Sequence, residues 1–256
     1  MKIISCCKIV PEEQDISVNS DKTLKLDKAG LKISLYDLNA LETGVELAAA
    51  QEGSTVTALT VGDKASTGNT KVRKDILSRG ADCLAVVGDD ALVGILPGET
   101  AKLLAGTAKK LGFDLILCGE GSADLYAQQT GLLLGELLGV PTINSVGKVT
   151  INGSTARVER DLEDEVEIVD VPLPAVLSVT TDINVPKIPS MKAILAASKK
   201  PVEEIALADA GYSADPASTM LSILAPDQAD RKREIIEGDS EEQIAAFAAN
   251  IRKILN

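Results

Sequence analysis

The chain has 256 residues, of which 45% are hydrophobic and only 2% aromatic, and its formal net charge is −12. A chain of this length and apolar content can bury one substantial core, which excludes an intrinsically disordered protein. The negative charge argues against nucleic acid or an anionic membrane as a partner, because both are negatively charged themselves. A core that lacks Trp must be built from Ala, Leu, Ile and Val, which is typical of helices packed on a parallel sheet.

Histidine is absent, and the four cysteines show no Cys-x-x-Cys spacing. We therefore expect no metal site, neither zinc nor iron–sulfur, and no His-dependent hydrolytic centre. Cys6 and Cys7 are interpreted as strand residues rather than redox thiols, since only Lys8 beside them is basic. The N-terminus lacks the order of a secretion signal, and no apolar run is long enough for a membrane span, so we expect a cytoplasmic protein.

Apolar runs and helical periodicity alternate through the first half of the chain. Regular alternation of this kind implies right-handed crossovers and a doubly wound, mostly parallel, Rossmann-like α/β sheet. Ser34 or Asp37 is expected to cap the first helix. The patterns predict strands at residues 2–10, 56–61, 83–87 and 114–118, helices at residues 35–50, 70–79 and 100–111, and a short hairpin at residues 16–26.

After Pro141 the pattern changes to short alternating strands at residues 146–151, 155–162 and 165–171, which predicts an antiparallel extension. A buried strand at residues 174–179 then returns to the core. We divide the chain into a nucleotide-binding domain, residues 1–199, and a C-terminal arm, residues 200–256. The arm has few apolar residues and ends in an amphipathic helix capped by Ser240, so we expect it to add little to this chain's core and to pack on a partner subunit.

Residues 115–138 join an apolar strand to a helix through a turn that contains Gly119 and Gly121. We expect this helix to begin near Asp124. Its free N–H groups, with Gln128, Gln129, Thr130 and Gly131 in the first turns, would bind an anion such as a phosphate. Spacing alone is equally compatible with an ordinary strand–loop–helix connection, because the turn lacks the third glycine of a dinucleotide fingerprint and the Lys of a P-loop.

The carboxyl ends of parallel strands meet at one edge of a sheet, which is where such folds bind ligands. Residues 6–8, 61–63 and 119–124 all lie at or near the carboxyl ends of predicted strands and should therefore lie together. This convergence favours a nucleotide site over a simple connection.

Several segments together resemble the β subunit of electron-transfer flavoproteins over nearly the whole chain. They are Cys6-Cys-Lys-Ile-Val-Pro, residues 33–42, the Gln-Gln-Thr-Gly core of residues 124–135 and, above all, residues 158–176, where Arg160 and an acidic cluster precede Pro174 and an apolar strand. Asp15 and residues 73–80 and 121–129 are closest to the branch associated with nitrogen fixation and carnitine reduction.

The resemblance implies a heterodimer with an α subunit, an FAD held mainly by that α subunit, and an adenine nucleotide bound in this chain. That nucleotide is AMP in simple carriers and a second FAD in electron-bifurcating ones. The family commonly has Asn-Pro where this chain has Ser34-Leu35, so a hydroxyl replaces a side-chain amide there. The nucleotide-site positions carried over are Cys6, Ser34, Leu35, Tyr36, Asp37, Val61 and residues 124–135.

The resemblance also implies an exposed loop that docks onto an acyl-CoA-type dehydrogenase or reductase, and here that loop carries Met191, Ile194 and Leu195. Ordinary helix packing is the alternative for these three side chains. The leading hypothesis is a subunit that carries electrons between such a dehydrogenase and another redox protein and has no catalytic residues of its own. The alternatives are an autonomous adenine-nucleotide-binding module or ATP-cleaving enzyme on the same fold, and a purely structural dimerisation subunit.

Overall fold

The computed structural model describes residues 1–212, 218–227 and 233–255. The chain separates into two compact units, Met1–Ile223 and Leu224–Asn256, which are described in turn. None of the helices in the described residues combines the length and the apolar character needed to cross a membrane.

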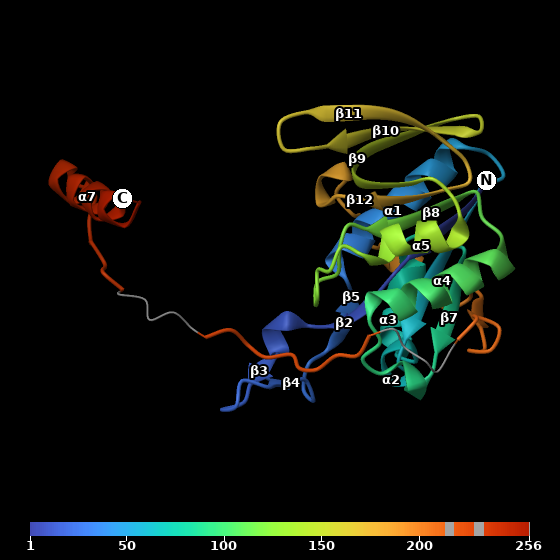
Figure 1. The fold of residues 1–256 in the computed structure, drawn as a ribbon, viewed down its shortest axis with the longest axis horizontal. Helices are drawn as coiled ribbons and strands as arrows, with labels where there is room; N and C mark the ends of the chain where they lie inside the picture. The colour runs from blue at the N-terminus through green and yellow to red at the C-terminus, as the bar shows by residue number, and fades with distance from the viewer. Residues whose placement is uncertain (213–217, 228–232, 256) are drawn as a thin grey trace. The chain divides into compact units, whose positions relative to one another are not determined.

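A nine-stranded mixed sheet forms the centre of the first unit, in the order β11-β10-β9-β12-β8-β1-β6-β7-β13 (Figure 1). The strands from β9 to β13 in that order are parallel to their neighbours, whereas β10 and β11 run antiparallel, which confirms the expected doubly wound α/β fold. The strands are β1 (Lys2–Cys6), β6 (Thr55–Gly62), β7 (Cys83–Gly88), β8 (Leu115–Gly119), β9 (Thr142–Asn152), β10 (Thr155–Asp161), β11 (Val166–Pro172), β12 (Ala175–Val179) and β13 (Val202–Glu204).

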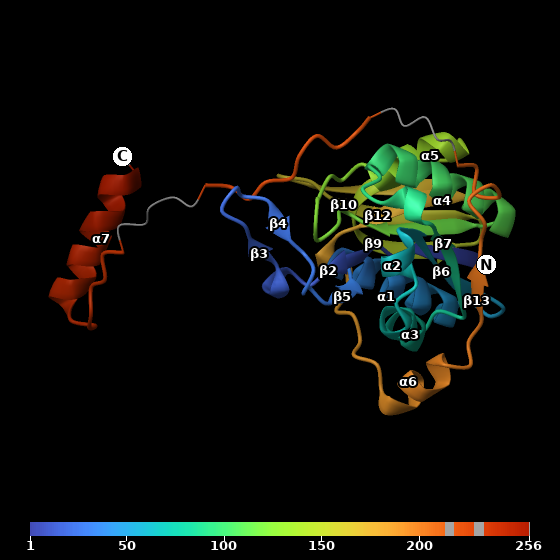
Figure 2. The ribbon, with the colours of Figure 1, turned by 90° about the horizontal axis from the view of Figure 1, so that it is seen from below.

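Helices cover both faces of this sheet (Figure 2). One face packs on α1 and α3 through Leu41 and Ile76, and the other packs on α4 and α5 through Leu103 and Leu134. The helices of the first unit are α1 (Leu35–Ala50), α2 (Lys64–Thr67), α3 (Thr70–Ser78), α4 (Pro97–Leu111), α5 (Thr130–Leu138) and α6 (Met191–Ala197), and short 3-10 helices cover Glu13–Asp15, Asp90–Leu92 and Thr181–Ile183.

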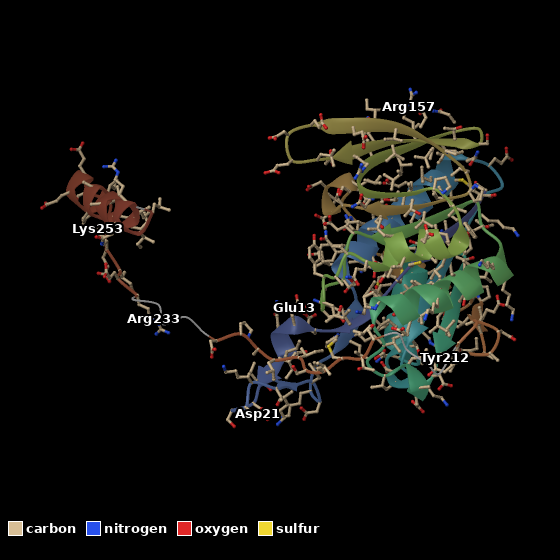
Figure 3. The ribbon with its side chains drawn as sticks, in the orientation of Figure 1. Glu13, Asp21, Arg157, Tyr212, Arg233 and Lys253 are labelled. Carbon is tan, nitrogen blue, oxygen red and sulfur yellow. The ribbon has the colours of Figure 1, made fainter. Side chains whose placement is uncertain are left out.

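The predicted strand at residues 2–10 is broken in the structure. The N–H of Cys7 still bonds to the Leu59 carbonyl at 2.8 Å, but the N–H of Lys8 bonds to the Asp37 carboxylate and turns the chain out of the sheet. The chain then forms β2 (Ile9–Pro11), which pairs with β5 (Leu31–Ile33) in a separate ribbon. The expected hairpin is present as β3 (Ser17–Val18) and β4 (Leu24–Lys25), with Asp21 in its turn (Figure 3).

The antiparallel extension forms as predicted, with one face turned to solvent. Val158 is buried on its inner face, whereas Arg157 points outward from β10 (Figure 3) and makes a two-fold ion pair with Asp170 on β11. This alternation is the period-2 pattern that predicted the strands. The acidic tip at residues 163–165 is exposed.

The expectation that residues from Lys200 onward add little to this chain's core is wrong for residues 202–212. Strand β13 pairs with β7 at the edge of the sheet, and Ile205 and Ala210 are buried in the core on the α4 side. Two apolar residues are enough to attach this segment to the core, because Ile205 and Ala210 pack into the cluster on the α4 side. In addition, the N–H of Ile205 extends the sheet by bonding to the Val86 carbonyl at 2.8 Å. Tyr212 lies on the same body (Figure 3).

The second unit contains one helix, α7 (Glu241–Leu255), among its described residues. Ser240 caps it as predicted: its hydroxyl accepts from the N–H of Gln243 at 3.4 Å, and the Gln243 side chain accepts from the N–H of Ser240 at 3.0 Å. This reciprocal pair is a capping box. The apolar side chains of α7 recur at helical spacing and are all exposed, namely Ile244, Phe247, Ile251 and Ile254.

Candidate functional site

The candidate site lies in the first unit, where the order of the sheet reverses. From β1 the chain moves outward through β6 and β7 and then returns to β8 on the other side of β1, so β1 and β8 flank the switch point. Open α/β sheets bind ligands outside the carboxyl ends of the strands at this point. A cavity of about 580 Å³ opens there, which is within the usual range for a small-molecule site.

The structure brings most of the predicted cofactor residues to this cavity. Cys6 and Val61 line it from the ends of β1 and β6, and Asp37 lines it from the first turn of α1. The remaining predicted residues that line it lie at the end of β8 or after it, namely Gly119, Gly121, Asp124, Gln128, Gln129, Thr130 and Gly131. Ser34, Leu35 and Tyr36 do not line it, so any part they take is indirect.

Asp37 ties the two strands of the switch point together. Its carboxylate accepts from the N–H of Lys8 at 2.7 Å and from the N–H of Gly119 at 3.2 Å. Burial raises the pKa of the Asp37 carboxyl to about 7, although these two N–H groups oppose the shift. The prediction that Asp37 is an alternative cap of α1 is therefore wrong. Its side chain instead holds the backbone at the floor of the cavity.

Ser34 and Tyr36 hold the loop that follows β8 rather than the cavity itself. Ser34 occupies the N-cap position of α1, but its buried hydroxyl accepts from the N–H of Ala123 at 3.2 Å and makes no cap hydrogen bond. The Tyr36 ring packs on the Tyr126 ring with 5.1 Å between centroids. Leu35 is exposed at the surface. The prediction that Ser34 caps α1 with its side chain is therefore wrong: its hydroxyl joins the start of α1 to the loop at residues 120–129.

Packing within the chain requires glycine at several positions in this region. A Cβ on Gly119 would lie 2.7 Å from the Tyr36 backbone, and one on Gly121 would lie 2.4 Å from the Tyr126 ring. A Cβ on Gly131 would lie 2.2 Å from the Ser178 hydroxyl on β12. Gly131 thus allows α5 to pack closely on the sheet.

Helix α5 begins at Thr130, six residues later than the sequence predicts. The intervening loop cannot be helical, because Tyr126 and Gln128 have left-handed φ values of 45° and 55°. The Gln129 side chain makes no cap hydrogen bond. The first N–H groups of α5 therefore have no acceptor within their own helix, and Thr130 and Gly131 at its start line the cavity, where an anion can accept from such groups.

The opposite wall of the cavity is apolar and was not predicted. Leu59, Leu92, Ile95 and Leu104 line it from β6, the following turns and α4. Apolar residues of the β3–β4 hairpin and of the end of this unit complete the wall, namely Ile16, Leu24, Leu26, Met220 and Ile223. Such a surface suits a planar ring. The sequence patterns around these apolar residues indicate that they are buried, but no local pattern shows that they line a cavity.

The cysteines at the floor are thiols suited to packing. A hydrogen bond with Cys118, together with burial, raises the pKa of the Cys6 thiol, and burial raises that of Cys7. A raised pKa disfavours the reactive thiolate. Over the described residues, no group of three or more His, Cys, Asp or Glu side chains is placed to hold a metal ion.

A second feature, away from the cavity, is an exposed apolar surface formed by Val185, Ile188, Met191 and Leu195. These side chains are 88%, 92%, 73% and 65% exposed, whereas the predicted neighbour Ile194 is half-buried. Contiguous exposed apolar side chains mark interaction sites.

Helix α1 fixes the segment that carries this surface. The buried Asn39 amide donates to the Thr181 carbonyl at 3.1 Å and to the Asn184 carbonyl at 2.8 Å. The buried Glu42 carboxylate binds both the N–H and the ammonium of Lys187. The backbone of the segment that carries this surface is thus held by side chains of the same helix whose first turn carries Asp37.

A family model for the electron transfer flavoprotein domain matches residues 23–210 of this chain. The match runs from β4 and α1 through α5 and past α6 to β13, so it includes the β8 side of the cavity, whereas β1 with Cys6 precedes the matched residues.

Proposed function

Because the chain belongs to the electron transfer flavoprotein domain family, whose members are electron carriers rather than enzymes, we propose that it is the β subunit of such a carrier. It forms a heterodimer with an α subunit and belongs to the branch associated with nitrogen fixation and carnitine reduction. Electrons pass through an FAD held mainly by the α subunit, between an acyl-CoA-type dehydrogenase or reductase and another redox protein. The observation that carries this proposal is the cavity at the switch point of the sheet.

The cavity holds an adenine nucleotide, either AMP or a second FAD. Its polar side offers the N–H groups at the start of α5 to a phosphate, and its apolar wall, with Leu59 and Leu104, accepts the adenine ring. A bound flavin supplies the capacity to take up and release electrons, and the protein sets its position and surroundings. The chain's own contribution is to hold the strand ends through Asp37 and to exclude water with the apolar wall.

The test is to co-express the chain with its α subunit, purify the complex, and identify the nucleotides released on denaturation. AMP together with one FAD per heterodimer indicates a simple carrier, whereas two FAD per heterodimer indicate the bifurcating type. A folded heterodimer that releases no adenine nucleotide other than the FAD of the α subunit would refute the nucleotide site in this chain.

The surface around Met191, with Ile194 and Leu195, receives the partner dehydrogenase. An exposed apolar anchor on a fixed backbone is suited to docking, since little order has to be gained on binding. Met191→Ala should weaken the interaction by roughly 1–3 kcal/mol, raising KM for the dehydrogenase while leaving flavin content unchanged. Val93→Ala, at a site equally exposed at 73%, is the matched control. A loss of flavin in Met191→Ala would instead indicate a packing role.

We propose in addition that the second unit, Leu224–Asn256, packs on the α subunit. The exposed apolar side chains of α7 support this assignment, because an isolated helix of this length is only marginally stable in water and its apolar face has to be covered.

A further inference from the structure

The cavity has an unusual charge balance for a site that takes a phosphate. Among the described residues that line it, Lys8 is the only one with a positively charged side chain. The acidic side chains that line it are Asp37, Asp63, Glu120 and Asp124. The state of Lys8 therefore decides how strongly the cavity attracts an anion.

Lys8 is already engaged by a carboxylate of the chain itself. Its ammonium donates to both oxygens of Asp124, at 2.8 and 2.6 Å. Burial alone would raise the pKa of Asp124, but the hydrogen bonds from Lys8 and Ser122 hold it below its usual value. Asp124 is thus a carboxylate at neutral pH, and the pair spans the cavity wall from the end of β1 to the loop after β8.

The loop that carries Asp124 is held in a demanding conformation. Tyr126 and Gln128 both adopt left-handed backbone angles, which are unfavourable for residues other than glycine and persist only where contacts enforce them. The Ser34 hydroxyl and the Tyr36 ring hold the loop from α1, and Lys8 holds it from β1. The Lys8–Asp124 contact differs from the other two because it alone consumes the cationic group of the cavity.

The same loop runs directly into α5, whose first N–H groups receive the phosphate under the function proposed above. A phosphate bound there and the Asp124 carboxylate are two anions competing for one ammonium. We propose that Asp124 sets the affinity of the cavity for phosphate by competing with the ligand for Lys8, an inference that rests on the proposed nucleotide function. Binding exchanges a carboxylate–ammonium pair for a phosphate–ammonium pair, so the net electrostatic gain is small.

Asp124→Asn removes the competing charge and leaves a side chain of nearly the same size. We expect the full-length chain, stripped of nucleotide, to bind AMP about three- to tenfold more tightly when it carries Asp124→Asn, as measured by isothermal titration calorimetry. Adenosine lacks the phosphate, so its affinity should not change. An equal gain for AMP and adenosine would show that the substitution only loosens the loop, and would overturn the inference.

Two further variants isolate Lys8 as the group that is released. In a Lys8→Met background Asp124→Asn should give no gain for AMP, because no ammonium remains to be freed. Glu120→Gln removes one negative charge from the same loop without releasing Lys8, so its gain should be clearly smaller than that of Asp124→Asn. A full gain in the Lys8→Met background would contradict the proposal.

The outcomes separate this inference from the function it rests on. If the wild-type chain binds AMP but Asp124→Asn binds it equally or more weakly, the competition is refuted while the nucleotide site stands. If neither protein binds AMP, FAD or adenosine, the nucleotide site itself is refuted, and the inference falls with it.

Discussion

The two units of the chain differ in how far their side chains find partners within the chain itself. In the first unit even charged side chains are satisfied internally: Asp37 accepts from two backbone N–H groups, and Glu42 pairs with Lys187. In the second unit the apolar side chains of α7, Phe247 among them, are exposed within the described residues. The difference shows that the first unit is completed by its own residues, whereas the apolar face of α7 is not covered by any of the described residues.

Truncation after Ile223 is the strongest test of this contrast. We expect the remaining chain to unfold cooperatively and to keep its adenine nucleotide, but to form no heterodimer with the α subunit, as judged by size-exclusion chromatography. Truncation after Lys200 is the contrasting variant, because it also removes β13, Ile205 and Ala210 and should abolish cooperative unfolding. Normal assembly of the chain that ends at Ile223 would show that the second unit is not the contact.

Asp37 provides a test of how the first unit is held together. Its pKa rises from 3.8 in the unfolded chain to about 7 in the folded protein, so the folded state keeps a proton that the unfolded state has lost. This group therefore makes stability fall as pH rises between these values. Between pH 5 and pH 8 the loss amounts to about 2–3 kcal/mol of unfolding free energy.

Urea denaturation at pH 5 and pH 8 measures this dependence. Asp37→Asn keeps a side chain of nearly the same size that cannot titrate, so it should remove this part of the pH slope. A variant with the same pH slope as the wild type would mean that another group titrates.

Gly131 tests the packing of α5 on the sheet. An added Cβ would lie 2.2 Å from the Ser178 hydroxyl, so we expect Gly131→Ala to lower the unfolding free energy by about 1–3 kcal/mol in thermal or urea denaturation. Gly98→Ala in α4 meets no atom within 4 Å and is the matched control. The double variant Gly131→Ala with Ser178→Ala should recover most of the loss, because the next contacts, with the Cβ atoms of Cys118 and Ser178, are 3.5 and 3.6 Å away. Failure of this rescue would place the defect elsewhere.

Local patterns predicted most of the fold because its elements satisfy their own hydrogen bonds and bury a periodic face. Helix α1 and the strands that follow it lie close to where periodicity placed them. The late start of α5 could not be predicted, since the left-handed angle of Tyr126 depends on a ring 90 residues earlier, Tyr36. The break after Cys7 likewise depends on Asp37, which takes the N–H of Lys8 out of the sheet.

The sequence predicted those parts of the candidate site whose position follows from the topology of the sheet. It did not predict the contacts between side chains that are distant in the sequence. The rule that parallel strands end at one edge placed Cys6, Val61 and Gly119 together, and all three line the cavity. Ser34 followed from the resemblance, but its hydroxyl is turned to the loop. Lys8 was correctly placed at this edge, yet its pairing with Asp124 joins positions 116 residues apart and has no local signature.

The smallest effect is expected from a substitution at the cap of α7, which tests by how much the stability of this helix contributes to heterodimer formation. Ser240 and Gln243 form a capping box, and removing a cap of this kind costs about 1 kcal/mol of helix stability. If α7 gains its order mainly on the α subunit, Ser240→Ala should weaken heterodimer formation about fivefold, which analytical ultracentrifugation would measure. The thermal unfolding and AMP affinity of the first unit should not change. Ser20→Ala, in the exposed turn of the β3–β4 hairpin, is the control and should leave assembly unaffected. An unchanged dissociation constant for Ser240→Ala would mean that α7 contributes nothing to the heterodimer contact, and that its apolar face serves another partner.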